Sequence, residues 1–222
     1  MDDFFIWNGI SSKDMGLKVK SFPPISISSA VYDDIDIEDR DGTLTEFKKY
    51  EATVKTVEAD FIGTEAMAYE VSKWLRDTGT ITFGNMENVY YKARINNVVP
   101  LEQILANKIY ELTIDFKCQP FGYLIDGDRW MDIKNNSILN NFGNYKSLPK
   151  IKVIGAGTLT INNINYIIKD SIEIDCEMEE VLDGKGDKFE CDEFPFLKAG
   201  KNIISYTSGI TKLEIKPNWR IL

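Results

Sequence analysis

The segment Tyr110-Glu111-Leu112-Thr113-Ile114-Asp115-Phe116-Lys117-Cys118 decides the fold class of this chain. Its apolar and polar residues alternate with a period of two, which is typical of a β-strand that buries one face. Similar alternation returns at Leu159 to Ile161, Ile164 to Ile168, Ile172 to Cys176 and Leu213 to Trp219. Turn residues such as Asn162-Asn163 and Lys169-Asp170 separate these strands, so the sequence predicts antiparallel sheets.

One segment has a helical period instead. Apolar positions recur at steps of three and four at Met67, Val71, Trp74, Leu75 and Thr78. Thr64 is a suitable N-cap and Gly79 a suitable stop, so we expect one amphipathic helix over residues 64–78 that covers a face of the first sheet. A hairpin follows, with strands at 80–83 and 89–95 around the loop 84–88.

The strand pattern stops near Gln119-Pro120, and the chain then becomes rich in asparagine over residues 135–144. We therefore predict two all-β domains, residues 1–119 and residues 120–222, with the asparagine-rich stretch in the opening loops of the second.

Composition excludes several classes of function. The formal charge of −9 and the lack of a compact Lys/Arg cluster argue against a protein that binds by neutralising phosphates. The chain has no histidine, which removes Ser-His and Cys-His catalysis and the commonest transition-metal ligand. Catalysis by a pair of carboxylates remains possible in principle. With 35 Asp and Glu residues, however, chance proximity explains any pair that could be chosen. We expect no enzyme, no catalytic residue, no metal and no cofactor.

Cysteines and the start of the chain indicate the compartment. Cys118, Cys176 and Cys191 are odd in number and widely spaced, so we predict reduced thiols, the first two on apolar strand faces. The acidic start Met1 to Phe5 does not resemble a signal peptide, and no apolar stretch is long enough to span a bilayer. These features predict a soluble protein made in the cytoplasm.

Two short motifs are candidates for a ligand-binding site. The acidic run Asp33 to Gly42 offers oxygens to a cation, but its spacing does not fit a calcium loop, so a solvated loop or a subunit contact is the preferred interpretation and a cation site the alternative. Gly155-Ala156-Gly157 lacks the third glycine of a dinucleotide loop and precedes a strand, which predicts a hairpin turn.

Four aromatic residues are candidates for a sugar-binding platform: Trp130, Tyr145, Tyr166 and Trp219. Burial in the core or in a subunit contact is the preferred interpretation of each, because aromatic rings supply large apolar area to both.

Several stretches, in order, resemble the phage distal tail protein (Dit) family. They are Phe5-Ile6-Trp7-Asn8-Gly9-Ile10-Ser11-Ser12-Lys13-Asp14-Met15-Gly16-Leu17-Lys18-Val19, Arg40-Asp41-Gly42, Trp74-Leu75-Arg76-Asp77-Thr78-Gly79, Tyr90-Tyr91-Lys92-Ala93, Phe194 to Ile204 and Ile215 to Arg220. Glu38-Asp39 departs from the Pro-Gly that the family often has before Arg-Asp-Gly, which leaves the path of that loop open.

The resemblance implies an N-terminal β-sandwich with one helix and a hairpin arm, and a C-terminal sandwich of galectin-like topology. It also implies six copies that form a ring at the distal end of a virion tail, with the N-terminal, ring-forming domains lining a channel through which DNA passes. That ring joins the tail tube to the tail-associated tip protein. We expect subunit contacts at residues 31–50 and 81–95. The alternative is a carbohydrate-binding module that recognises the host cell envelope.

Overall fold

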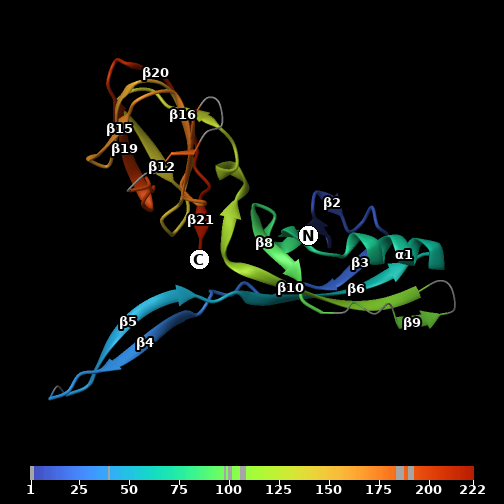
Figure 1. Ribbon diagram of the computed structural model, residues 1–222. Coiled ribbons are helices and arrows are strands. Elements are labelled where there is room, and N and C mark those ends of the chain that lie inside the picture. The colour runs from blue at the N-terminus through green and yellow to red at the C-terminus, as the bar shows by residue number, and fades with distance from the viewer. Residues whose placement is uncertain are drawn as a thin grey trace. The chain divides into compact units, whose positions relative to one another are not determined.

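The computed structural model describes residues 3–39, 41–97, 99, 102–105, 109–183, 188–189 and 193–222. These residues form mainly antiparallel strands and, within the described ranges, one α-helix, so the all-β prediction is confirmed (Figure 1). Contacts divide the chain into two compact units, residues 1–122 with Leu222 and residues 123–221. None of the described helices is long and apolar enough to cross a membrane.

The N-terminal unit is built on eight strands of a nine-stranded sheet, whose ninth strand is β21 (Arg220–Ile221), and on a separate two-stranded ribbon. Its strands are β1 (Phe5–Trp7), β2 (Ile10–Ser11), β3 (Leu17–Ser21), β4 (Ala30–Asp36), β5 (Thr43–Tyr50), β6 (Thr53–Ile62), β7 (Thr78–Phe83), β8 (Val89–Ile95), β9 (Glu102–Leu105) and β10 (Ile109–Leu124). The order in the large sheet is β2-β1-β7-β8-β10-β6-β3, and β9 pairs with β10. Strands β4 and β5 pair with each other.

The core of this unit lies on the face of β10 that the alternation predicted. Tyr110, Leu112, Ile114, Phe116 and Cys118 are all buried. The Phe116 ring packs against other core rings, with centroid distances of 5.6 Å to Phe5, 5.3 Å to Trp7 and 5.9 Å to Phe83. Residues far apart in the sequence therefore meet around β10.

Helix α1 (Glu65–Trp74) begins where the sequence predicted and ends earlier. The Thr64 hydroxyl accepts a hydrogen bond from the Met67 N–H at 3.5 Å, which confirms the N-cap. The predicted end at Thr78 is wrong, because the chain turns at Asp77, whose φ is +62°, and enters β7. Gly79 serves that strand instead: a Cβ there would lie 1.7 Å from Asn8 Oδ1.

The helix covers the first sheet as expected. Val71 and Leu75 are buried in its core, and Trp74 stacks on Phe5 at 5.6 Å while its indole N–H donates to the Trp7 carbonyl. The hairpin of β7, the 3₁₀ turn η1 (Gly84–Met86) and β8 is also confirmed. It does not protrude, however, because β1 and β10 flank it in the sheet.

The C-terminal unit is a sandwich of a six-stranded and a four-stranded sheet. After η2 (Ile125–Gly127), its strands are β11 (Met131–Asp132), β12 (Ser137–Asn141), β13 (Lys150–Gly155), β14 (Gly157–Ile161), β15 (Ile164–Ile168), β16 (Ile172–Asp175), β17 (Glu180–Asp183), β18 (Lys188–Phe189), β19 (Gly200–Tyr206), β20 (Ile210–Lys216) and β21 (Arg220–Ile221). The sheet orders are β11-β20-β13-β16-β17-β18 and β12-β19-β14-β15.

Two predictions in this unit are wrong. The asparagine-rich stretch is not all loop, since β12 lies inside it and pairs with β19. Gly155-Ala156-Gly157 is not a hairpin turn, because β13 and β14 belong to different sheets and the turn carries the chain between them. Gly155 has a φ of +104°, and a Cβ on it would lie 2.2 Å from the Gly209 carbonyl oxygen, so only glycine fits.

Strand β10 runs through Pro120 to Leu124, past the predicted strand end. The division into domains 1–119 and 120–222 stays a prediction. Cys118 and Cys176 are buried, and burial raises the pKa of the Cys118 thiol to about 12. Cys191 lies outside the described residues.

Candidate functional site

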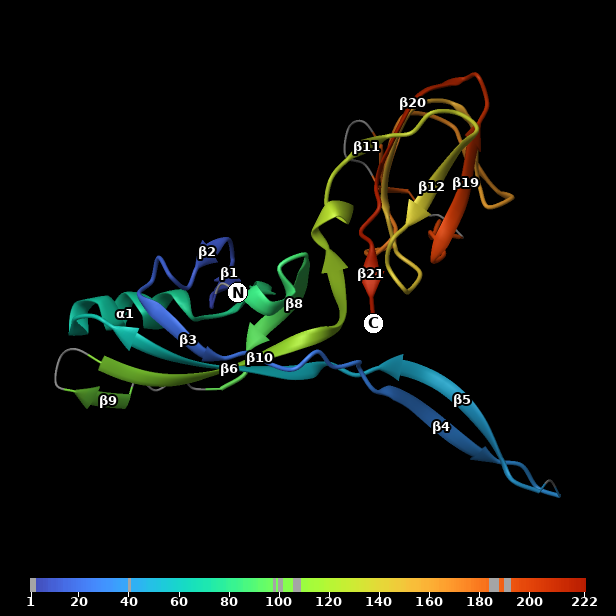
Figure 2. The ribbon, with the colours of Figure 1, turned by 180° about the vertical axis from the view of Figure 1, so that it is seen from behind.

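The two-stranded ribbon of β4 and β5 is the most distinctive surface of the N-terminal unit, and we call it the arm. Its pairing runs from Ala30 opposite Tyr50 to Asp36 opposite Thr43. In the described part of the chain, no other strand pairs with it (Figure 2). The acidic run is therefore partly strand, and the prediction of a loop over Asp33 to Gly42 is wrong for residues 33–36.

The arm leaves large apolar side chains uncovered. Tyr32 is 55% exposed and Phe47 44% exposed, and their rings meet edge to face at 5.8 Å. Ile35 and Leu44 form an exposed cross-strand pair three residues further toward the tip. At the base, Tyr50 contacts Phe121 at 5.8 Å, which anchors the arm to β10. Uncovered apolar area of this extent on a paired ribbon is typical of a contact surface.

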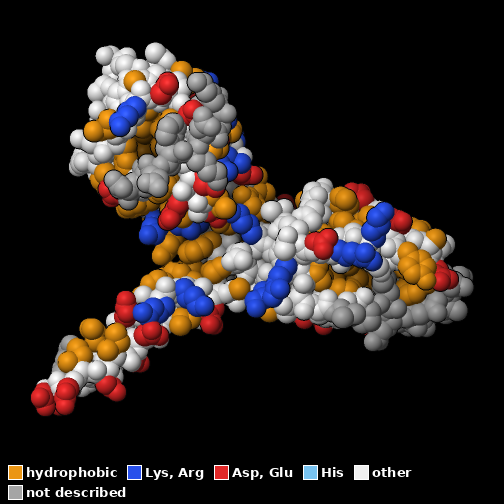
Figure 3. Space-filling view, in the orientation of Figure 1, with side chains coloured by type: hydrophobic (Ala, Val, Ile, Leu, Met, Phe, Trp, Pro, Cys, Tyr) orange, Lys and Arg blue, Asp and Glu red, His pale blue; other side chains and the backbone are white. Residues whose placement is uncertain are grey.

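The arm is also strongly acidic. Figure 3 shows carboxylates gathered at its tip and apolar side chains along it. The acids are Asp33, Asp34, Asp36, Glu38, Asp39, Asp41 and Glu46. Lys48 pairs with Asp33 at 3.3 Å and Glu46 at 2.8 Å. Within the described ranges, no group of three or more Asp, Glu, Cys or His could hold a metal ion. Arg40 lies outside those ranges.

The segment before the arm, residues 22–29, is fixed to the sheet by hydrogen bonds. Asn85 Nδ2 donates to the Pro23 carbonyl at 3.1 Å, and the Ser28 hydroxyl donates to the Pro120 carbonyl at 2.8 Å. Ile25 and Ile27 nonetheless point to solvent, with 79% and 74% of their surface exposed. Two outward isoleucines on an anchored segment extend the apolar surface beside the arm. Neither isoleucine was predicted as a surface residue, although their alternation with Ser26 and Ser28 was the available signal.

A lysine occupies a core position near this segment. Lys55 is 2% exposed, donates to the Ser26 hydroxyl at 3.3 Å and lies 4.9 Å from the centroid of the Tyr91 ring. In the described part of the chain it has no carboxylate partner, and burial lowers the pKa of its ammonium group. The ammonium group fixes the segment before the arm but costs folding free energy.

The four aromatic candidates do not form a platform. Trp219 is 1% exposed and belongs to the C-terminal core, and Tyr166 packs against the same core. Trp130 is 36% exposed, but Lys152 Nζ covers its ring at 4.2 Å. The guanidinium of Arg220 lies 5.6 Å from the Tyr145 ring. Core packing and cation–π contacts account for these rings.

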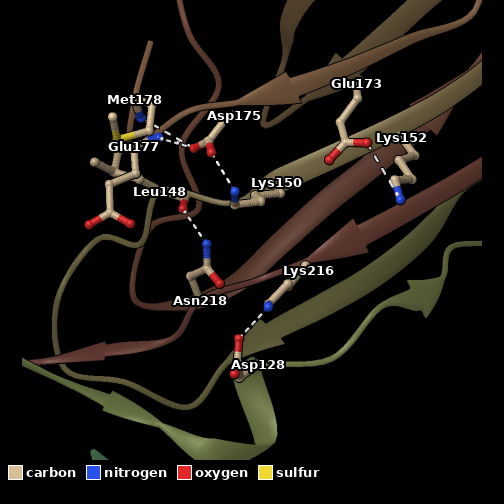
Figure 4. Close-up of polar contacts among 10 residues, drawn as sticks. All are labelled: Asp128, Leu148, Lys150, Lys152, Glu173, Asp175, Glu177, Met178, Lys216 and Asn218. Atoms are coloured by element: carbon tan, nitrogen blue, oxygen red, sulfur yellow. Dashed lines mark hydrogen bonds and ion pairs between the residues drawn. The ribbon is translucent and has the colours of Figure 1, made fainter. Parts of the chain in front are cut away.

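The outer face of the six-stranded sheet is covered by paired charges (Figure 4). Lys150 pairs with Asp175 and Lys152 with Glu173, each across β13 and β16, and Lys216 pairs with Asp128. Asp175 also accepts hydrogen bonds from the backbone N–H groups of Glu177 and Met178. Because the charged side chains on this face pair with one another, the face is suited to contact with solvent.

Comparison with known proteins gives a fold. No family model matches the chain, and no curated protein matches it. Among solved structures, the Dit protein of phage SPP1, described as a paradigm of the hub adsorption apparatus in phages that infect Gram-positive bacteria, matches with a TM-score of 0.69 and 15% identity over 96% of both chains. Chains of the phage P2 baseplate in its activated conformation with calcium and with strontium match over 96% of both chains with a TM-score of 0.47, at 8% and 9% identity. The resemblance read from the sequence is thus confirmed in structure: over nearly its whole length the chain has the fold of the SPP1 Dit hub protein.

Proposed function

We propose that this chain is a structural hub subunit of a phage tail tip or baseplate, without enzymatic activity. The observation that carries the proposal is the likeness of fold to the SPP1 hub protein over 96% of both chains. In this account the protein is made in the host cytoplasm and becomes part of the distal end of the virion tail. It joins the tail tube to the tail-associated tip protein as a homohexameric ring, through which DNA passes.

The arm supports the ring part of the proposal. A closed ring needs two different surfaces on each subunit, because its contacts are head to tail. A projecting ribbon with uncovered Tyr32 and Phe47 is suited to one of them. The second predicted contact surface, residues 81–95, is less suited, since β7 and β8 lie inside the large sheet and only their outward face is available.

The test is the mass of the purified chain by light scattering over a range of concentrations, with negative-stain images of any large species. Six-fold rings are expected. Excision of the arm gives the matched variant: Ala30 and Tyr50 are cross-strand partners, so an Asn-Gly turn can replace residues 31–49. We expect this variant to fold and to stay monomeric. Rings of unchanged mass from the arm-less variant would show that the arm is not a ring contact.

A further inference from the structure

A cluster of lysines that form no ion pair with any described residue lies at one end of the four-stranded sheet. The buried side chain of Asn141, at the end of β12, joins the surrounding segments: its Nδ2 donates to the carbonyls of Tyr145 and Leu197, and its backbone pairs with Gly200. Around this point lie Lys146, Lys198, Lys201, Phe142 and Phe196, which we call the lysine patch. All five side chains are exposed.

Two of these lysines, Lys146 and Lys198, are cross-strand neighbours. Ser147 and Leu197 form an antiparallel bridge with backbone hydrogen bonds of 2.8 and 3.0 Å, and both are fully buried. Lys146 and Lys198 flank the bridge on the same side, facing away from the core. Like charges at such positions repel and destabilise the fold. Lys146 also lies 5.6 Å from the centroid of the Phe196 ring.

Lysines of the six-stranded sheet differ from those of the lysine patch in having ion-pair partners. Lys150, Lys152, Lys212 and Lys216 on the six-stranded sheet each pair with a carboxylate. Lys146, Lys198 and Lys201 pair with none in the part of the chain that the structure describes, although the protein has 35 acids and a net charge of −9. Exposed lysines that have no ion-pair partner among the described residues attract an anionic partner.

The surroundings of the lysines indicate the chemistry of that partner. Ile138 and Ile203 are cross-strand neighbours on the outer face of the same sheet, 58% and 59% exposed, and Phe142 is 76% exposed. An anionic ligand without apolar groups would leave this area uncovered. The patch therefore fits an acidic protein segment that also carries apolar side chains.

The arm has that chemistry. It carries carboxylates at its tip and exposed Tyr32, Ile35, Leu44 and Phe47 along its length. We propose that the lysine patch is the docking site for the acidic arm of a second copy of this chain. The inference rests on the proposed self-assembly and names the second of the two surfaces that a head-to-tail contact requires.

Charge reversal on the full chain tests the inference. We expect Lys146→Glu with Lys198→Glu to raise the dissociation constant of self-association about tenfold or more, since two cross-interface attractions become repulsions. Asp34→Lys with Asp36→Lys should do the same, and the four changes together in one chain should restore association. Lys134→Glu with Lys169→Glu changes the net charge equally at exposed lysines outside the patch, and should leave the constant within about threefold.

Zero-length cross-linking of lysine to carboxylate supplies a direct readout. In a mixture of isotope-labelled and unlabelled chains, cross-linked peptides that join residues 30–50 to Lys146 or Lys198 should carry mixed labels. Rings that form normally after patch reversal, or arm cross-links that reach only lysines of the N-terminal unit, would overturn the inference and leave the hub function standing. A full chain that stays monomeric and gives no such cross-link would also overturn it, and the hub function would then be tested in assembled tails.

Discussion

Strand β10 and the arm both carry large apolar side chains, but in opposite environments. In β10 the alternate residues Leu112, Ile114 and Phe116 are at most 2% exposed, whereas in the arm Tyr32, Ile35 and Phe47 are 43% to 55% exposed. The difference is that α1 and the curved sheet cover β10, and no other described strand pairs with the arm. Apolar residues on a strand therefore do not by themselves indicate core, and a second layer decides whether they become core or contact surface.

The largest expected effect comes from removing one ring on each side of this comparison. Phe116→Ala should lower the free energy of unfolding by about 3 to 5 kcal/mol, because it leaves a cavity among Phe5, Trp7 and Phe83. Phe47→Ala should lower it by less than about 1 kcal/mol in the monomer. Denaturant unfolding of both variants at low concentration measures the difference, and equal losses would mean that the arm ring is covered in the monomer.

A charged residue on the covered side gives an intermediate effect. Lys55→Met should raise the free energy of unfolding at pH 7 by about 1 kcal/mol, because it removes a buried ammonium group that has no carboxylate partner. The pKa of Lys55 is lowered in the folded state, so the wild-type chain gains stability as the pH rises from the folded pKa toward the ordinary value of 10.5. The advantage of the variant should shrink over the same range.

Unfolding curves of both proteins between pH 7 and the highest pH at which each still folds reversibly measure this trend. Lys117→Met is the matched control on the neighbouring strand, since Lys117 is not fully buried. An advantage of Lys55→Met that does not change with pH would contradict the assignment to the ammonium group.

The smallest effect is expected on a face open to solvent. Burial on its own raises the pKa of Asp175, but the hydrogen bonds from Lys150, Met178 and Glu177 outweigh it and lower the pKa below 3.8. Its carboxylate therefore stabilises the fold above that value, and the contribution is lost as the pH falls through the folded pKa. Asp175→Asn should cost about 0.5 to 1 kcal/mol at neutral pH and progressively less in acid.

Glu173→Gln, which breaks a more exposed ion pair at 3.5 Å, should cost less than about 0.5 kcal/mol. Thermal unfolding at several pH values separates the two variants. Equal losses from both would show that the backbone hydrogen bonds to Asp175 add nothing.

Sequence patterns were reliable where one strong local signal acted. The alternation of residues 110–118 gave the central strand, Thr64 gave the helix start, and Asn162-Asn163 gave a turn in which both residues have positive φ. They failed where a distant partner decided. Gly79 looks like a helix stop, but its function is to let Asn8 approach β7, and that contact spans 71 residues.

Of the two candidate contact surfaces, local sequence predicted one and not the other. Residues 31–50 were predicted as a contact from their charge, although their strand pairing was not. The lysine patch was not predicted, because Lys146 and Lys198 are separated by about 50 residues and meet only through the bridge between Ser147 and Leu197.

The sequence by itself determined that the chain is an all-β protein with one helix near residue 65, free of histidine chemistry, and similar in motif order to phage distal tail proteins. These properties are local or compositional. Only the tertiary structure decided which apolar faces are covered, which glycines allow another segment to approach the backbone closely, and which lysines form ion pairs with carboxylates. Each of these depends on pairing between strands distant in the chain, which sheet register fixes and local pattern does not.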